Sequence, residues 1–283
     1  MTGRDREAGG QASEPAAGQV APIDGSGTDR ARCVLAPNPG LMTLDGTNTW
    51  LVAEPGSPTA VVVDPGPDDG EHLRRISAIA DQAGRRIAAI VLTHGHFDHS
   101  AGARTLADLT GASVRAVDPA HRLGSEGLPP GAVIADGGCE LEIIGTPGHS
   151  ADSVSLYLRA DRAVLTGDTV LGRGTAVIAE DGSLGDYLRS LGRLRALADA
   201  ADLQTLLPGH GPLLAEPSTV LDFYLTHRAE RLAEVRAALA AGDRTTDQIV
   251  ARVYADVDRS LWPFAKMSVR AQLRYLKELG ERA

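Results

Sequence analysis

The stretch Ile90–Gly102, "IVLTHGHFDHSAG", places three histidines and one aspartate within six residues, directly after an apolar run. The preceding run Ile87–Thr93 is rich in aliphatic residues and predicts a buried strand, so the polar side chains follow on the loop that leaves it. Neutral imidazole and carboxylate groups are ligands of transition metals such as Zn²⁺, and each ion needs three or four of them. Because only 8 of the 283 residues are histidines, this spacing predicts a metal site. The four candidate ligands are His94, His96, Asp98 and His99.

Residues of the same ligand types recur in three later loops. "TPGHS", "TGDT" and "LLPGHG" contain His149, Asp168 and His210, each flanked by glycine near the end of an apolar, strand-like run. Seven ligands, with one carboxylate shared, would fill two adjacent metal ions and leave an open position for water. The remaining histidines lie outside such loops and are interpreted as ordinary hydrogen-bonded residues: His72, His121 and His227.

Composition and charge restrict the classes of protein to which the chain can belong. The formal net charge of −9 argues against a surface generally coated by nucleic acid, so any such binding must be local. Cys33 and Cys139 are too few for a disulfide framework. The first residues lack the apolar segment of a secretory signal, and no apolar run is long enough to span a bilayer. We therefore expect a cytoplasmic protein with no membrane partner.

The pattern along the chain predicts three regions. Residues 1–30 are rich in Gly, Ala, Ser and acidic residues and predict a disordered tail. Over residues 31–215, short β-branched runs alternate with helical patterns, which predicts an α/β domain that contains all the candidate ligands. From residue 216 to 283 the pattern is entirely helical and predicts a small C-terminal domain of three helices.

The ligand motifs, in their order along the chain, resemble the successive motifs of the metallo-β-lactamase fold superfamily, and "VVVDPG" (Val61–Gly66) resembles the first of them. The resemblance implies an α/β fold, a four-layer αββα sandwich with the site at one edge of two facing sheets, followed by the all-helical, winged-helix-like C-terminal domain. Carried over position by position, it assigns His94, His96 and His149 to a first metal, Asp98, His99 and His210 to a second, Asp168 to both, and Asp64 to hydrogen bonds that orient the ligand loops.

Such a pair of divalent ions implies a metal-dependent hydrolase. Two ions lower the pKa of a bridging water towards neutrality, which gives a hydroxide nucleophile, and they polarise the oxygen of the bond under attack. We expect zinc, with manganese or iron as alternatives. Asp98 is the candidate catalytic residue, because it can orient the hydroxide and accept its proton.

The substrate depends on residues outside the ligand motifs. "APNPGLMTLDGTNTWLV" (Ala36–Val52) and the helical C-terminus resemble the β-lactamase-like 2 branch, whose best-studied members are endoribonucleases specific for single-stranded RNA. This resemblance implies a phosphodiesterase acting on single-stranded RNA and places Asn48 near the metals as a candidate substrate contact. Zinc β-lactamases are exported and typically have cysteine where this chain has Asp168, so antibiotic hydrolysis is not expected as the main activity.

Four cations in the last predicted helix could contact phosphate groups. They are spaced by 4, 4 and 3 residues and therefore share one helix face: Lys266, Arg270, Arg274 and Lys277. The same spacing is equally typical of the solvated face of an ordinary amphipathic helix. We also expect the β-wing of a winged helix to be missing, because the third helix runs to the end of the sequence.

Two other functions remain open from the sequence. A thioester hydrolase of the glyoxalase II kind, or a lactonase, would use the same metals on a small acyl substrate, although no basic and aromatic cluster suited to glutathione is evident. A non-catalytic binding module would be expected to have lost ligands, and none is lost. The C-terminal helices could contact substrate or join two chains in a homodimer.

Overall fold

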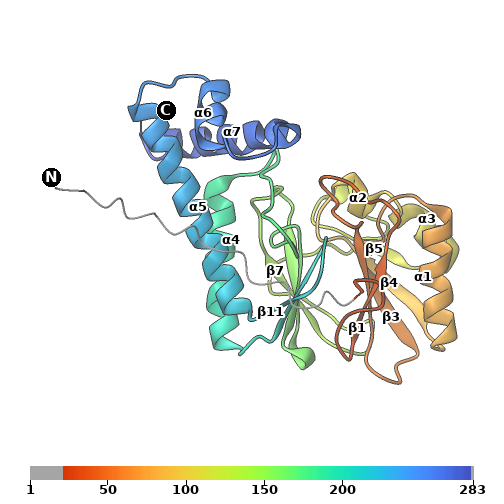
Figure 1. Ribbon diagram of the computed structural model, residues 1–283. Helices are drawn as coiled ribbons and strands as arrows, with labels where there is room; N and C mark the ends of the chain where they lie inside the picture. The colour runs from red at the N-terminus through yellow and green to blue at the C-terminus, as the bar shows by residue number, and fades with distance from the viewer. Residues whose placement is uncertain (1–21, 282–283) are drawn as a thin grey trace.

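The computed structural model describes residues 22–281, and two β-sheets lie face to face at its centre (Figure 1). The first sheet has the order β1-β2-β3-β4-β5 and the second has the order β11-β10-β9-β8-β7-β6. The strands of the first are β1 (Ala31–Leu35), β2 (Asn48–Val52), β3 (Thr59–Val63), β4 (Arg86–Val91) and β5 (Ser113–Arg115). Those of the second are β6 (Val133–Ile134), β7 (Leu141–Gly145), β8 (Val154–Leu158), β9 (Ala163–Gly167), β10 (Thr205–Pro208) and β11 (Leu214–Ala215).

Helices cover the outer face of each sheet. Helices α1 (Gly70–Gln82) and α3 (Ala103–Thr110) lie against the first sheet, and α4 (Leu184–Ala200) and α5 (Pro217–Ala240) lie against the second. Asp69 caps α1, because its side chain accepts hydrogen bonds from the backbone N–H groups of Glu71 and His72. The layers therefore follow the order helix, sheet, sheet, helix, and the predicted fold class is confirmed.

Three apolar clusters hold these layers together. The central cluster fills the space between the sheets and includes Trp50, Val91 and Leu165. Nearly every residue of β2, β3, β8 and β9 is buried, as expected for strands covered on both faces. A core of this kind fixes the strand ends from which the site is built, so the ligand loops start from rigid positions.

The C-terminal helices share a core with the second sheet. The cluster that joins α4 to this sheet continues through Leu232 and Val235 of α5 to Ile249 of α6 (Thr246–Val253) and Val269 of α7 (Trp262–Glu278). Within residues 22–281, no strand follows β11. Across the same range, no helix is both long and apolar enough to cross a membrane.

The prediction of a disordered tail over residues 1–30 is wrong for residues 22–30, which are ordered. Residues 1–21 lie outside the described range, but residues 22–30 pack against the first sheet. Ile23 is buried in the central cluster. Asp24 accepts a hydrogen bond from the N–H of Leu35 and pairs with Arg75 at 2.5 Å. Composition did not reveal this segment, because its order depends on specific contacts such as the burial of Ile23 and the pairing of Asp24 with Arg75.

Candidate metal centre

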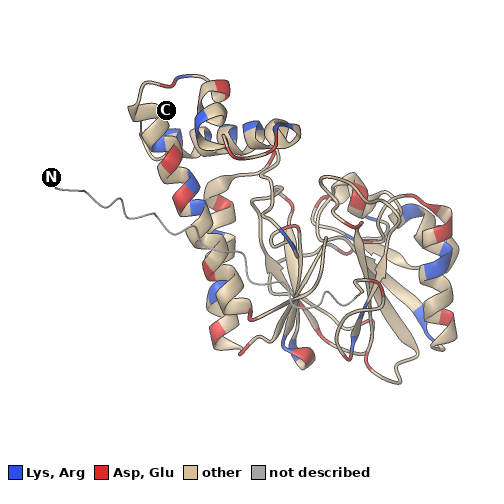
Figure 2. Cartoon of the chain, in the orientation of Figure 1, with Lys and Arg blue, Asp and Glu red and all other residues tan. Residues whose placement is uncertain are grey.

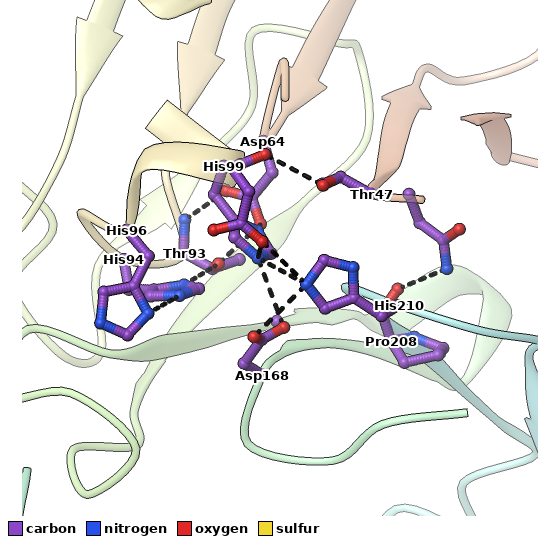
Figure 3. Close-up of polar contacts among 12 residues, drawn as sticks. Thr47, Asp64, Thr93, His94, His96, His99, Asp168, Pro208 and His210 are labelled. Atoms are coloured by element: carbon purple, nitrogen blue, oxygen red, sulfur yellow. Dashed lines mark hydrogen bonds and ion pairs between the residues drawn. The ribbon is translucent and has the colours of Figure 1, made fainter. Parts of the chain in front are cut away.

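The candidate ligands leave the two sheets at one common edge, where the loops after β4, β7, β9 and β10 meet (Figure 3). β3 and β4 are parallel, and so are β9 and β10, so the carboxyl ends of each pair lie together. The N–H of Val154 donates to the carbonyl of Thr93 at 2.8 Å, which ties the sheets together at this edge. A short helix, α2 (Phe97–Ser100), carries Asp98 and His99 into the same space.

Three histidines form the first group of ligand atoms. His96 Nδ1 lies 3.0 Å from His94 Nε2 and 3.0 Å from His149 Nε2. His149 Nδ1 donates to the carbonyl oxygen of Val177 at 2.6 Å, so the lone pair of a neutral His149 ring lies on Nε2. Three imidazole nitrogens directed at one point suit a single cation.

The second group consists of Asp98, His99 and His210. His210 Nε2 lies 3.1 Å from Asp98 Oδ2 and 3.2 Å from His99 Nε2. The outer nitrogen of each ring is held by an acceptor, because His99 Nδ1 lies 2.9 Å from Asp64 Oδ2 and His210 Nδ1 lies 3.1 Å from the carbonyl of Gly46. The Nε2 atoms of both rings are thereby directed inward, as metal ligands require.

Asp168 lies between the two groups. Its Oδ2 is 3.6 Å from His149 Nε2 and 3.5 Å from His210 Nε2, and its Oδ1 is 3.4 Å from His99 Nε2. Oδ1 is buried without meeting hydrogen-bond criteria to any described residue. A buried carboxylate oxygen of this kind fits a cation, so the donor set could hold two metal ions bridged by Asp168.

The charges of the candidate ligands compensate one another. Burial would raise the pKa of Asp168, but the neighbouring His210 and His99 outweigh it and hold this pKa well below its usual range. Burial would lower the pKa of His210, and the charge of Asp168 instead raises it to about 9. In contrast, burial holds the pKa of His94 well below its ordinary value, and His99 adds to this effect. His94 is therefore more readily deprotonated than His210, as ligation requires.

Asp64 occupies the supporting position that the resemblance implies. It follows β3 in a left-handed backbone conformation with a φ of 53°. Its Oδ1 accepts from the N–H of Thr93 at 2.7 Å, and its Oδ2 accepts from the hydroxyl of Thr93 at 2.6 Å as well as contacting His99. Asp64 thus connects the strand end before "THGHFDH" to a ring of the second group.

Asn48 does not reach the space between the ligand groups. Its side chain is fully buried, and its amide donates to the carbonyls of Pro208 at 2.9 Å and Gly211 at 2.8 Å. Asn48 therefore stabilises the backbone of the His210 loop. The structure does not place it as the substrate contact that the sequence predicted. Thr47, which the sequence did not single out, donates its hydroxyl to the carbonyl of Asp98 at 3.0 Å. A threonine and an asparagine at the start of a strand give no distinguishing signal on their own.

None of the candidate ligand groups includes a residue of α7, whose basic residues are blue in Figure 2. Lys266 pairs with Asp247 of α6 at 2.7 Å, whereas Arg270, Arg274 and Lys277 are exposed and form no ion pair within residues 22–281. Tyr275 of the same helix packs beside Gly185 in the first turn of α4. The structure therefore leaves three of the four predicted cations free.

Comparisons with known proteins agree with this geometry. The family model described as "Metallo-beta-lactamase superfamily" matches residues 42–210, which is more than half of the chain. The chain belongs to the metallo-β-lactamase superfamily. A second model, "Beta-lactamase associated winged helix domain", matches residues 245–281. The prediction of a superfamily hydrolase with a C-terminal winged-helix-related region is confirmed.

Individual relatives support the predicted branch. The chain is 32% identical over 275 residues to a protein of Caenorhabditis elegans named "Beta-lactamase-like protein 2 homolog", covering 94% of this chain and 90% of the relative. It is 27% identical over 266 residues to the Drosophila melanogaster protein of the same name, with 88% of each chain covered. A beta-lactamase domain protein from Burkholderia ambifaria has the same fold, with a TM-score of 0.76 at 23% identity, covering 93% of this chain and 91% of that chain.

Proposed function

We propose that this hydrolase binds two zinc ions and cleaves phosphodiester bonds in single-stranded RNA. The observation on which the proposal depends is the pairing of a two-metal donor set with free cations on α7, as Arg270, Arg274 and Lys277 make no ion pair in the described part of the chain. Two bound ions would acidify the attacking water and polarise a phosphoryl oxygen. His94, His96 and His149 would hold the first ion, Asp98, His99 and His210 the second, and Asp168 both.

Asp98 is the carboxylate best placed to take a proton from the attacking water. Its side chain is 30% exposed, against 11% for Asp168, so it is the more accessible of the two carboxylates. Burial would raise its pKa, but a hydrogen bond from His210 and the charge of His99 outweigh burial and lower it. Asp98 is therefore ionised at neutral pH and able to act as a base.

Two surface features favour a nucleic acid over a small acyl substrate. Phe97 lies between the ligand residues His96 and Asp98, and it is 77% exposed. An exposed aromatic ring is a platform on which a base can stack. Tyr275 of α7 packs beside Gly185 in the first turn of α4. The start of α4 is in turn joined to the His149 loop, because the N–H of Ser183 donates to the carbonyl of Gly148 at 3.0 Å. The α7 cations are thus carried on a helix anchored next to the site.

The first experiment offers the Zn²⁺-loaded protein four substrates side by side: single-stranded RNA, S-lactoylglutathione, an acyl lactone and a chromogenic cephalosporin. We expect RNA cleavage that His96→Ala abolishes and no turnover of the small substrates. Turnover of the thioester or the lactone with intact RNA would replace the proposal with an acyl hydrolase. Failure of the wild-type protein to bind two metal ions would contradict the mechanism itself.

The second experiment tests the α7 cations. A triple variant, Arg270→Ala with Arg274→Ala and Lys277→Ala, should raise the KM for RNA. It should also reduce the slope of log affinity against log salt concentration by about 2, because each phosphate contact on a single strand contributes about 0.7. The matched control replaces three exposed arginines of the first sheet and its covering helices that form no ion pair within residues 22–281: Arg74, Arg86 and Arg104. If both triple variants weaken RNA binding equally, the loss comes from net charge alone and the α7 cations are not specific phosphate contacts.

A further inference from the structure

The loop of residues 169–183, between β9 and α4, contacts ligand residues of both groups. The N–H of Gly172 donates to the carbonyl of His210 at 2.8 Å. The carbonyl of Val177 accepts from His149 Nδ1 at 2.6 Å, and the N–H of Ala179 donates to the carbonyl of His149 at 2.9 Å. The loop contains no helix or strand, so its shape depends on contacts from outside it.

Three buried side chains of the helical layer supply those contacts. The hydroxyl of Tyr187 in α4 donates to the carbonyl of Thr169 at 2.7 Å. The hydroxyl of Tyr224 in α5 accepts from the N–H of Leu171 at 2.8 Å and lies 2.9 Å from the carbonyl of Gly174. The guanidinium of Arg228, one turn further along α5, donates to the carbonyl of Ala176. Together they fix the loop from Asp168 to Val177.

Arg228 is an unusual residue for this position. It is only 6% exposed, and it has no carboxylate partner within residues 22–281. Its guanidinium lies 5.0 Å from the centre of the Tyr187 ring, and its Nε has no hydrogen-bond partner in the same range. Removing a cation from water is costly, and an apolar side chain of similar size would often be as stable in a core. Its one hydrogen bond within residues 22–281, to Ala176, therefore points to a role in placing the loop.

We propose that Arg228 is a positioning residue for His149. It holds the peptide of Ala176, so the next carbonyl, that of Val177, keeps the hydrogen of His149 on Nδ1 and leaves Nε2 to the metal. Tyr224 supports the same loop from one turn earlier on α5. A helix beyond the ligand motifs thereby takes part in assembling the first metal group. The inference rests on the metal-binding part of the proposed function and is independent of the substrate.

The test measures metal affinity rather than activity. Arg228→Met removes the donor and keeps much of the side-chain volume. We expect it to weaken Zn²⁺ binding at the first site by about 10- to 100-fold, the range typical for loss of contacts that support a ligand. Competition with a chromogenic chelator measures this affinity. The Co²⁺-substituted variant should show a changed visible absorption spectrum. Arg228→Lys, which keeps a donor, should lie closer to the wild type.

The control is Arg236→Met on the same helix, because Arg236 pairs with the exposed Glu281 and does not touch the loop. Wild-type affinity and an unchanged Co²⁺ spectrum in Arg228→Met would overturn the inference, as would an equal loss in Arg236→Met. If circular dichroism shows that Arg228→Met does not fold, Tyr224→Phe decides: weakened first-site binding supports the inference and unchanged binding overturns it. Failure of the wild type to bind metal would instead contradict the proposed function.

Discussion

Replacing Asp64 by asparagine should weaken the second metal site and leave the first nearly intact. Asparagine fits the left-handed conformation of this residue, whose φ is 53°, so the backbone should not change. The amide oxygen can still accept from the N–H of Thr93. The amide nitrogen, however, replaces the oxygen that faces His99 Nδ1 at 2.9 Å, and a donor then opposes a donor.

The expected loss follows from this mismatch. With asparagine present, His99 is more stable with its hydrogen on Nε2, the nitrogen directed towards Asp98 and His210. Metal binding must move that hydrogen back to Nδ1 and leave two buried donors opposed. An unsatisfied buried donor costs about 1–3 kcal/mol, which corresponds to a loss of about 5- to 150-fold in affinity.

A two-step Zn²⁺ titration against a chelator of known affinity measures both sites. The matched control is Asp69→Asn, which removes the same charge nearby but keeps an α1 cap, because asparagine caps helices as well as aspartate does. Two sites of wild-type affinity in Asp64→Asn would refute the reasoning. So would an equal loss in Asp69→Asn, because the effect would then come from net charge and not from the orientation of the His99 ring.

Two further predictions concern stability. Burial, with the charge of Arg75, lowers the pKa of His72 from 6.5 to about 4, so the unfolded chain binds this proton more tightly. The contribution of His72 to the free energy of unfolding should be complete above pH 6.5 and should fall by up to about 1.4 kcal/mol per pH unit towards pH 4. Urea unfolding of the metal-free proteins should show a shallower fall with pH for His72→Gln than for the wild type. A Cβ at Gly182 would lie 2.3 Å from the carbonyl oxygen of Gly148, so Gly182→Ala should lower Tm and first-site affinity. Gly192→Ala, in open space within α4, should raise Tm slightly, and an unchanged Tm in Gly182→Ala would contradict the steric argument.

The ligand set could be predicted from the sequence because much of it is local. His94, His96, Asp98 and His99 lie within six residues, so their proximity in space follows from their proximity in the chain. His149, Asp168 and His210 required one further step, the expectation that strands of a layered α/β fold present their ends at a common edge. The structure brings these loops together as that expectation requires.

Side-chain direction and helix partners could not be predicted in the same way. Asn48 begins β2, and only the pairing of this strand end with the His210 loop brings its amide to the carbonyl of Pro208. Lys266 shares a helix face with Arg270, but its pairing with Asp247 depends on how α6 packs on α7. Arg228 gave no signal, because a basic residue in an amphipathic helix is ordinarily solvated.

The outer contacts of the five histidines show which ring has an open side. Four of the rings have a protein partner on the nitrogen that faces away from the other candidate ligands, supplied by Thr93, Asp64, Val177 or Gly46. His96 differs: its Nδ1 faces inward, and its Nε2 has no hydrogen-bond partner within residues 22–281. It is also the one histidine of the five that is only partly buried, and the exposed Phe97 follows it directly. The open side of the centre is therefore the α2 side. If the proposed function holds, we expect the exposed Phe97 to be among the first residues that a substrate contacts.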